Sequence, residues 1–242
     1  MVEEEMKIKR NLNFHPQGII VDVDGTLTDP DGFLNLDAAK YIRILEKYGI
    51  MVMLASGNAL PVTKALSDYI GCSGPVIAED GGVIFSNEKI IVNGSNYMAR
   101  QALLKLRENF GERVIESYSN PFRYTDVAIK RTIPIEDVRK VVSQYPDLKV
   151  VDSKFAYHIH NKSIDKGLGF KIACELISKD PKLIIAIGDS ELDIPMFKLA
   201  GYSVATNNAP EEVKEVTDCV TSKAFGEGFI EFVRYMLKTI KK

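Results

Sequence analysis

The sequence has few cysteines, and their positions exclude two kinds of cysteine-based site. Cys72, Cys174 and Cys219 are odd in number and widely separated in a chain of 242 residues. This spacing favours neither a disulfide framework nor a zinc site. Three small, buried thiols are typical of a reducing compartment, so we expect a cytoplasmic protein.

An excess of one charge and long apolar runs are also missing. The formal net charge is −2 and the isoelectric point is about 6.0. The chain therefore lacks the excess of basic residues that would indicate a nucleic-acid partner. No apolar run approaches membrane-spanning length. Residues Met1 to Arg10 are charged throughout and lack the apolar centre of a signal peptide. We therefore expect no nucleic-acid partner and no membrane partner.

Apolar runs and helical stripes alternate in the first and last thirds of the chain. This order predicts right-handed crossovers between parallel strands, an α/β fold with a Rossmann-like parallel sheet. The expected strands are Gly18–Asp22, Ile50–Ala55, Pro75–Ala78, Leu183–Ile187, Tyr202–Ala205 and Cys219–Thr221. The expected helices are Leu36–Tyr48, Ala59–Ile70, Lys166–Ser178, Leu192–Leu199, Pro210–Val216 and Gly228–Lys241. Residues Met1 to Pro16 lack periodicity and indicate an extension that is loose at its start.

The middle third has a different pattern. Val83 to Val92 predicts a hairpin, and two amphipathic helices are expected at Asn96–Phe110 and Ile135–Tyr145. Alternating segments predict half-exposed antiparallel strands at Val114–Tyr118, Phe122–Lys130, Leu148–Val151 and Ala156–His160. The sequence therefore predicts a small α+β module, residues 83–160, inserted into a core formed by residues 1–82 and 161–242.

Two carboxylates follow the first buried strand. Asp22 and Asp24 lie two residues apart, so in an extended chain they point to the same side. Two adjacent carboxylates at the end of a buried strand are costly unless a cation neutralises them, and Mg²⁺ prefers such oxygen ligands. The alternative is that Asp24-Gly25 only turns a hairpin.

Other polar groups follow other expected strands at the same edge of the sheet. They are Ser56-Gly57-Asn58, Gly188-Asp189-Ser190 and Asp193, with Lys166 at a helix start. Ligands bind at this edge in open α/β sheets, and the set suits a phosphate beside a metal ion. Each group also has a simpler explanation: a turn, a helix cap for Asp189-Ser190, a first-turn acidic residue for Asp193, or a solvated lysine.

The order of these groups resembles the motifs of the haloacid dehalogenase-like phosphotransferases. Asp22-Val23-Asp24-Gly25-Thr26, Ser56, Lys166 and Gly188-Asp189-Ser190-Glu191-Leu192-Asp193 match the four motifs in order. The inserted module, residues 83–160, resembles the α/β cap domain of the Cof-like branch. More closely, the chain is similar to the archaeal-type phosphoglycolate phosphatases. That similarity rests on Ser56-Gly57-Asn58, Tyr157-His158-Ile159 and Asp193-Ile194-Pro195-Met196-Phe197, whereas Glu79-Asp80-Gly81-Gly82 departs from the usual Glu-Asn-Gly-Gly.

The resemblance implies a Mg²⁺-dependent phosphatase and a role for each motif residue. Asp22 would be the nucleophile and Asp24 the general acid and base. Thr26, Ser56, Gly57 and Lys166 would bind the phosphoryl group. Asp22, the backbone carbonyl of Asp24, Asp189 and Asp193 would hold the Mg²⁺ ion.

Substrate selection would fall to residues that face this site. Arg123, His158 and Lys162 are candidates for binding a small phosphorylated acid, and Asn208 is expected near the site. The alternatives are an exposed sheet position for Arg123, a hydrogen-bonded strand histidine for His158, and a helix cap before Pro210 for Asn208.

We expect a phosphomonoesterase that acts on 2-phosphoglycolate. The sequence leaves open another small substrate such as a sugar phosphate, a phosphoacceptor signalling domain, and a phosphomutase. It also leaves open a homodimer. Asp24 argues against the signalling domain, since a stable phosphoryl signal needs no acid–base group.

Overall fold

The structure is a computed structural model that describes residues 5–240. Its largest feature is a nine-stranded sheet with the strand order β1-β12-β11-β10-β2-β3-β4-β5-β6. The strands of this sheet are β1 (Lys7–Ile8), β2 (Gly18–Asp22), β3 (Met51–Ala55), β4 (Val76–Ala78), β5 (Val83–Ser86), β6 (Lys89–Val92), β10 (Ile184–Gly188), β11 (Tyr202–Ala205) and β12 (Cys219–Val220). The expected α/β fold with a parallel sheet core is confirmed.

Strand β2 lies at the centre of this sheet and sets the position of the site. It pairs in parallel with β10 on one side and β3 on the other, and every residue of β2 is buried. Burial on both faces explains the continuous apolar run of its sequence. The carboxyl ends of β10, β2 and β3 therefore meet at one edge of the sheet.

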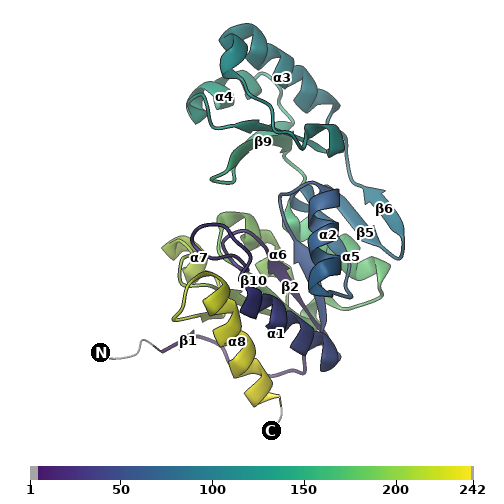
Figure 1. Ribbon diagram of the computed structural model, residues 1–242, viewed down its shortest axis with the longest axis vertical. Coiled ribbons are helices and arrows are strands. Elements are labelled where there is room, and N and C mark those ends of the chain that lie inside the picture. Colours follow the sequence, from purple (N-terminus) through teal and green to yellow (C-terminus); the bar gives the residue numbers. More distant parts are fainter. Residues whose placement is uncertain (1–4, 241–242) are drawn as a thin grey trace.

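Helices cover both faces of the core sheet (Figure 1). Helices α1 (Leu36–Lys47) and α8 (Phe225–Thr239) pack on one face through residues such as Ile42 and Phe229. Helices α5 (Lys166–Leu176), α6 (Ile194–Leu199) and α7 (Glu211–Glu215) pack on the other face. Helix α2 (Leu60–Ile70) follows β3, and the 3-10 turn η1 (Glu79–Gly81) follows β4. This arrangement explains why alternate residues of the central strands enter two different apolar clusters.

The inserted module has a separate three-stranded sheet with the order β7-β9-β8. Its elements are α3 (Tyr97–Phe110), β7 (Asp126–Lys130), α4 (Ile135–Val142), β8 (Leu148–Asp152) and β9 (Ala156–Asn161), which we call the cap. Short 3-10 turns (Gly111–Arg113, Asn120–Phe122) lie between α3 and β7. The two helices cover one face of the antiparallel sheet, and Figure 1 shows β9 on the side that faces the core. An inserted α+β module is thus confirmed.

The structure corrects the expected start of this module. The hairpin β5–β6 was expected to belong to it, but β5 pairs antiparallel with β4 and extends the core sheet. The alternating pattern of a hairpin does not reveal which sheet edge it joins. Residues Val114–Tyr118 form an isolated bridge between Glu116 and Ile129 rather than a strand.

The N-terminal segment is more ordered than its sequence pattern indicates. Strand β1 pairs antiparallel with β12, and Leu12 is buried in the core. Tyr202 donates a hydrogen bond from its hydroxyl to the carbonyl of Arg10 at 2.7 Å. The expected looseness at the very start concerns residues 1–4, which lie outside the described residues, as does Lys241 at the end of the expected last helix.

Candidate active site

Lys166 lies between two buried carboxylates at the carboxyl edge of the core sheet. Its ammonium donates to Asp22 Oδ1 and, at 2.6 Å, to Asp193 Oδ1. The side chains of all three residues are almost fully buried. Lys166 is the first residue of α5, and the Asp165 side chain caps that helix by accepting from the Leu168 amide. These residues lie together at one edge of the sheet, as the sequence predicts.

Asp189 is the third carboxylate of the group, and its two oxygens have different partners. Thr26 donates from its hydroxyl to Asp189 Oδ1 at 3.1 Å, and the Asn208 amide donates to Oδ2 at 3.0 Å. The same Asn208 amide donates to the Gly25 carbonyl at 2.9 Å. Gly25 itself has φ +90°, and a Cβ there would lie 2.5 Å from Asp189 Oδ2, so the turn requires glycine.

These contacts bear on two expectations about individual residues. Thr26 is expected to contact phosphate, and in the structure its hydroxyl donates to Asp189. Asn208 does not cap the helix before Pro210. Its side-chain oxygen accepts from the Phe225 amide, so it connects the start of α8 to Asp189.

Asp193 also organises the loop that carries Asp189. Its Oδ2 accepts from the amides of Asp189 and Ser190 and from the Ser190 hydroxyl. With Oδ1 bound to Lys166, both oxygens of Asp193 already have partners. Asp193 therefore fixes the positions of Lys166 and of the loop, and it also adds a negative charge to the site.

Asp24 and Ser56 are connected through Asn58. The Asn58 side-chain amide donates to Asp24 Oδ2 at 2.9 Å and to Ser56 Oγ at 3.1 Å, and its backbone amide also donates to Ser56 Oγ. Ser56 thus accepts two hydrogen bonds, which leaves its hydroxyl hydrogen to donate to Asp24 or to a bound phosphoryl group. The Ser56-Gly57-Asn58 segment is more than a turn.

The pKa values of these groups reflect burial and the charge of Lys166. Burial raises the pKa of Asp22 well above its ordinary value, Lys166 opposes the shift, and Asp193 and Asp189 add to it. Burial and Asp193 raise the pKa of Asp189 to about 6. Burial would lower the pKa of Lys166, but Asp193 and Asp22 outweigh burial and raise it. Negative charge is therefore in excess at this edge.

This charge balance fits a bound divalent cation. Asp22, Asp189 and Asp193 each offer a carboxylate oxygen, and these three atoms lie within 4.8 Å of one another. Carboxylate oxygens are the ligands that Mg²⁺ prefers, and one ion would offset the negative charge that Lys166 leaves. The donor set thus matches the expected metal in chemistry and in charge.

Three expected specificity residues lie in the cap or its linker, but the structure does not place them together. Arg123 donates to Asp126 at 2.7 Å and to the Gly57 carbonyl at 3.1 Å, and His158 Nδ1 lies 2.8 Å from Asp126 Oδ2. Lys162 instead donates to the Pro146 carbonyl at the edge of the cap. Arg123 and His158 are almost fully buried, so the exposed sheet position considered for Arg123 is wrong.

Sequence reasoning missed Asp126 and Glu79. Asp126 connects Arg123 and His158, although nothing in the alternation of β7 distinguishes it from an ordinary polar strand residue. Glu79 is buried in the core and accepts from the amides of Tyr124 and Thr125 in the cap. The positive φ of Glu79 (+51°) and Asp80 (+52°) gave no signal in the sequence beyond the two following glycines.

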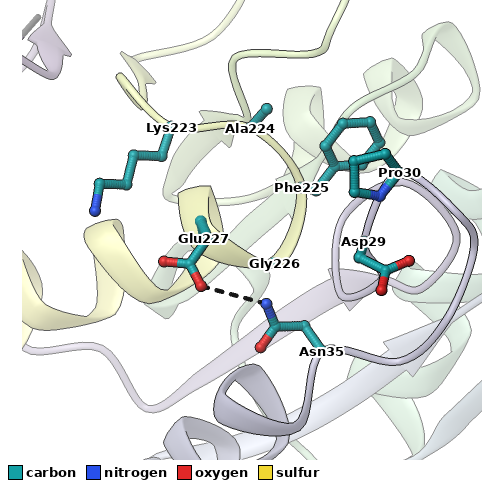
Figure 2. A pocket seen from close by; sticks show the side chains of 8 residues that line it. All are labelled: Asp29, Pro30, Asn35, Lys223, Ala224, Phe225, Gly226 and Glu227. Atoms are coloured by element: carbon teal, nitrogen blue, oxygen red, sulfur yellow. Dashed lines mark hydrogen bonds between the residues drawn. The ribbon is translucent and has the colours of Figure 1, made fainter.

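A separate cavity lies beside the start of α8. Its volume is about 460 Å³, and its lining includes Asp29, Asn35, Phe225 and Glu227. Figure 2 shows Asn35 pointing toward Glu227, to which its amide donates at 3.4 Å. None of the carboxylates that contact Lys166 lines this cavity.

Comparison with known proteins identifies the family. The haloacid dehalogenase-like hydrolases match residues 19–149 and 127–233, which together span most of the chain. The chain belongs to the haloacid dehalogenase-like hydrolases. Within the described residues, none of the helices of this family member is long and apolar enough to cross a membrane.

Relatives within the hydrolase family cover nearly the whole chain. A phosphoglycolate phosphatase of Methanospirillum hungatei is 41% identical over 222 residues, which are 90% of this chain and 95% of that protein. One of Methanopyrus kandleri is 37% identical and covers 92% of this chain and 97% of that protein. The crystal structure of Thermoplasma acidophilum 0175 superposes with a TM-score of 0.85 at 29% identity, over 93% of this chain and 99% of that chain.

Proposed function

We propose that the protein is a Mg²⁺-dependent phosphomonoesterase that hydrolyses 2-phosphoglycolate to glycolate and phosphate. The observation that carries this proposal is the contact of buried Lys166 with Asp22 beside Asp189 and Asp193. One ammonium and three carboxylates at the end of parallel strands suit a phosphoryl group held next to a metal ion.

Asp22 is the proposed nucleophile. Its carboxylate attacks phosphorus in line, the ester bond to the leaving oxygen breaks, and an aspartyl-phosphate forms. Lys166 holds Asp22 in place through its hydrogen bond and offsets charge on the phosphoryl oxygens. Positioning and charge stabilisation of this kind supply most of the acceleration in phosphoryl transfer.

Asp24 is the proposed general acid and base. Burial raises the pKa of its carboxyl group, opposed by the charge of Lys166 and by hydrogen bonds from Ser56 and Asn58. A raised pKa favours the protonated form of the carboxyl group, which suits donation of a proton to the leaving oxygen and later acceptance of one from the attacking water. Asn58 fixes the orientation of Asp24 through Oδ2.

Asp22, Asp189 and the backbone carbonyl of Asp24 are the proposed Mg²⁺ ligands, with Asp193 close by. When bound, the ion supplies positive charge that stabilises the phosphoryl oxygens in the transition state. Thr26 and Asn208 then keep Asp189 in its ligating orientation.

The proposed substrate follows from the relatives rather than from the core. The phosphoglycolate phosphatases of Methanospirillum hungatei and Methanopyrus kandleri match this chain over at least 95% of their own lengths. The sugar phosphatase BT4131 shares the fold with a TM-score of 0.73 at 16% identity, over 92% of this chain and 98% of that chain. The fold alone therefore does not choose the substrate, and we assign that choice to the cap.

The test is phosphate release from 2-phosphoglycolate, several sugar phosphates and an aryl phosphate, with Mg²⁺ or with a chelator. We expect Mg²⁺-dependent release with a clear preference for 2-phosphoglycolate. Equal rates on all esters would keep the mechanism and reject the named substrate. No release of phosphate, with a long-lived phosphoprotein or a phosphorylated product, would contradict the proposal and favour a signalling domain or a mutase.

We place the boundary of the cap after Val92, since β5 and β6 belong to the core sheet.

The proposed partner of the enzyme is a small phosphorylated metabolite. The cytoplasmic location and the absence of nucleic-acid and membrane partners remain predictions from the sequence, and a homodimer remains open.

A further inference from the structure

We propose that Arg123 and His158 form a carboxylate-binding subsite between the cap and the core, which selects phosphate esters of short hydroxy acids. This inference rests on the proposed phosphatase function, because the subsite must lie next to a phosphoryl site. It assigns the choice of substrate to two named side chains and to the Asp126 carboxylate that holds them.

His158 lies on the face of the cap sheet that α3 and α4 do not cover. Successive residues of a strand point to opposite faces, and Tyr157 and Ile159 pack into the apolar cluster beneath α3 and α4. His158 therefore points to the other face of the cap sheet. Figure 1 shows the core on the side of the cap opposite α3 and α4. A buried polar residue on this face needs hydrogen-bond partners, and the described structure supplies only one for His158.

Asp126 fixes both Arg123 and His158. Its carboxylate accepts from Arg123 Nη1 at 2.8 and 2.7 Å and contacts His158 Nδ1 at 2.8 Å. Arg123 Nε donates to Ser119 Oγ at 2.9 Å, so the guanidinium plane cannot rotate freely. Burial would raise the pKa of Asp126, but His158 and Arg123 outweigh burial and lower it, so the carboxylate stays ionised.

Two nitrogens of this group remain available to a ligand. Within residues 5–240, neither Arg123 Nη2 nor His158 Nε2 has a hydrogen-bond partner. Neither is among the fully buried atoms without a partner, which include Asp80 Oδ1 and both ring nitrogens of His160. Neither nitrogen is therefore fully buried, and an anion at this junction of cap and core could contact Arg123 Nη2 and the His158 ring.

The proposed subsite contacts the backbone next to the proposed phosphoryl site. Arg123 Nη1 donates to the carbonyl of Gly57, the residue after Ser56, and adjacent Cα atoms are about 3.8 Å apart. A substrate held at Ser56 and Lys166 would thus need only a short chain to bring a carboxylate to Arg123. This geometry favours an acid whose carboxylate lies one carbon from the ester oxygen over longer or uncharged leaving groups.

The experiment compares 2-phosphoglycolate with 2-hydroxyethyl phosphate, in which a CH₂OH group replaces the carboxylate. Arg123→Met, Arg123→Lys and His158→Gln are assayed beside wild type. Arg139→Met serves as the control, since Arg139 lies on α4 and its side chain, among residues 5–240, pairs only with exposed Glu136. Thermal unfolding of each variant shows whether the cap remains folded, and Arg123→Lys and His158→Gln keep the test decisive if Arg123→Met does not fold.

We expect each subsite variant to lose about ten- to a hundredfold in kcat/KM for 2-phosphoglycolate, mainly through KM, because a charged hydrogen bond is lost. The value for 2-hydroxyethyl phosphate should change by less than about threefold, and Arg139→Met should match wild type on both esters. An equal loss on both esters in folded variants would overturn the subsite and leave Arg123 as a structural contact. A wild-type enzyme without preference between the two esters would also overturn it. Absence of phosphate release from every ester would instead contradict the proposed function.

Discussion

At the scale of single residues, the proposed metal ligand Asp189 depends on the neighbours that orient it. The Asn208 amide donates to Asp189 Oδ2 and to the Gly25 carbonyl, while its oxygen accepts from the Phe225 amide. Partners of this kind fix the direction of a ligating carboxylate without contacting the substrate. We therefore expect Asn208 to act as a positioning residue.

Replacing Asn208 by Ala should raise the Mg²⁺ concentration that the enzyme requires more than it lowers the rate at saturating Mg²⁺. We expect the Mg²⁺ concentration that gives half the maximal rate to rise about ten- to a hundredfold, with a smaller change in the maximal rate. A titration of phosphatase activity with Mg²⁺ measures this shift. Asn207→Ala is the matched control, because the contact of Asn207 with Lys223 uses its backbone amide. An unchanged Mg²⁺ requirement in Asn208→Ala would remove this role.

Asp126 should make the stability of the protein sensitive to acid. Its pKa is lowered in the folded state, so its contribution to stability is complete above its ordinary value of 3.8 and is lost as the pH falls through the folded-state pKa. Asp126→Asn should cost about 3–5 kcal/mol at neutral pH, since it leaves the buried Arg123 without its carboxylate. Urea unfolding at neutral and acidic pH, beside Asp137→Asn at the half-buried start of α4, should show the difference from wild type narrowing in acid. A constant difference would contradict this account.

At the scale of elements, the close approach of α5 to the turn after β4 places Lys166 in the site. A Cβ on Gly81 would lie 2.0 Å from the carbonyl oxygen of Asp165, the residue that caps α5. A Cβ on Gly169 would come 2.6 Å from Gly81 Cα. The absence of side chains at both positions lets the helix start reach the acidic cluster.

Gly81→Ala should therefore lower activity by displacing α5. A displacement of about 1 Å at a reacting group can cost about a hundredfold in rate, so we expect a loss of that order in kcat. Gly111→Ala is the control, because Gly111 also has positive φ but no atom lies within 4 Å of its added Cβ. Comparing kcat and the thermal midpoint of both variants separates backbone strain from displacement. Equal kcat values in the two variants would show that the packing of α5 on Gly81 does not position Lys166.

The core elements were predictable because each carries its own pattern. A continuous apolar run that ends in Asp22 or Asp189 indicates a buried strand and a polar group at its carboxyl end. The hairpin Val83–Val92 was also found, but its sheet was not, because pairing depends on a free edge at β4 that no local pattern encodes.

The cap side of the site was less predictable. Arg123, Asp126 and His158 come together only when β7 pairs with β9 across a long connection, so Asp126 gave no local signal. Lys162 had the right charge and a nearby position in the chain, yet its ammonium donates to the Pro146 carbonyl. Side-chain direction at a junction of two units follows from tertiary contacts.

At the scale of the whole molecule, we propose that the cap supplies groups to a site whose chemistry lies in the core. Glu79 of the core accepts from the Tyr124 and Thr125 amides, and Arg123 donates to the Gly57 carbonyl, so the two units meet beside the phosphoryl site. Exclusion of water by such a cover favours phosphoryl transfer to a carboxylate over direct hydrolysis. The central claim is that this carboxylate is Asp22.

The most direct test of that claim is to trap the phosphoenzyme. In Asp24→Asn, an aryl phosphate still loses its leaving group without a proton, but water lacks its general base, so a phosphoryl group should remain on the protein. Acid quenching followed by intact-mass and peptide analysis should find one phosphoryl group per chain on Asp22. The double variant Asp22→Asn with Asp24→Asn should show none. A phosphoryl group on another residue, or steady phosphate release by Asp22→Asn at the wild-type rate, would contradict the account.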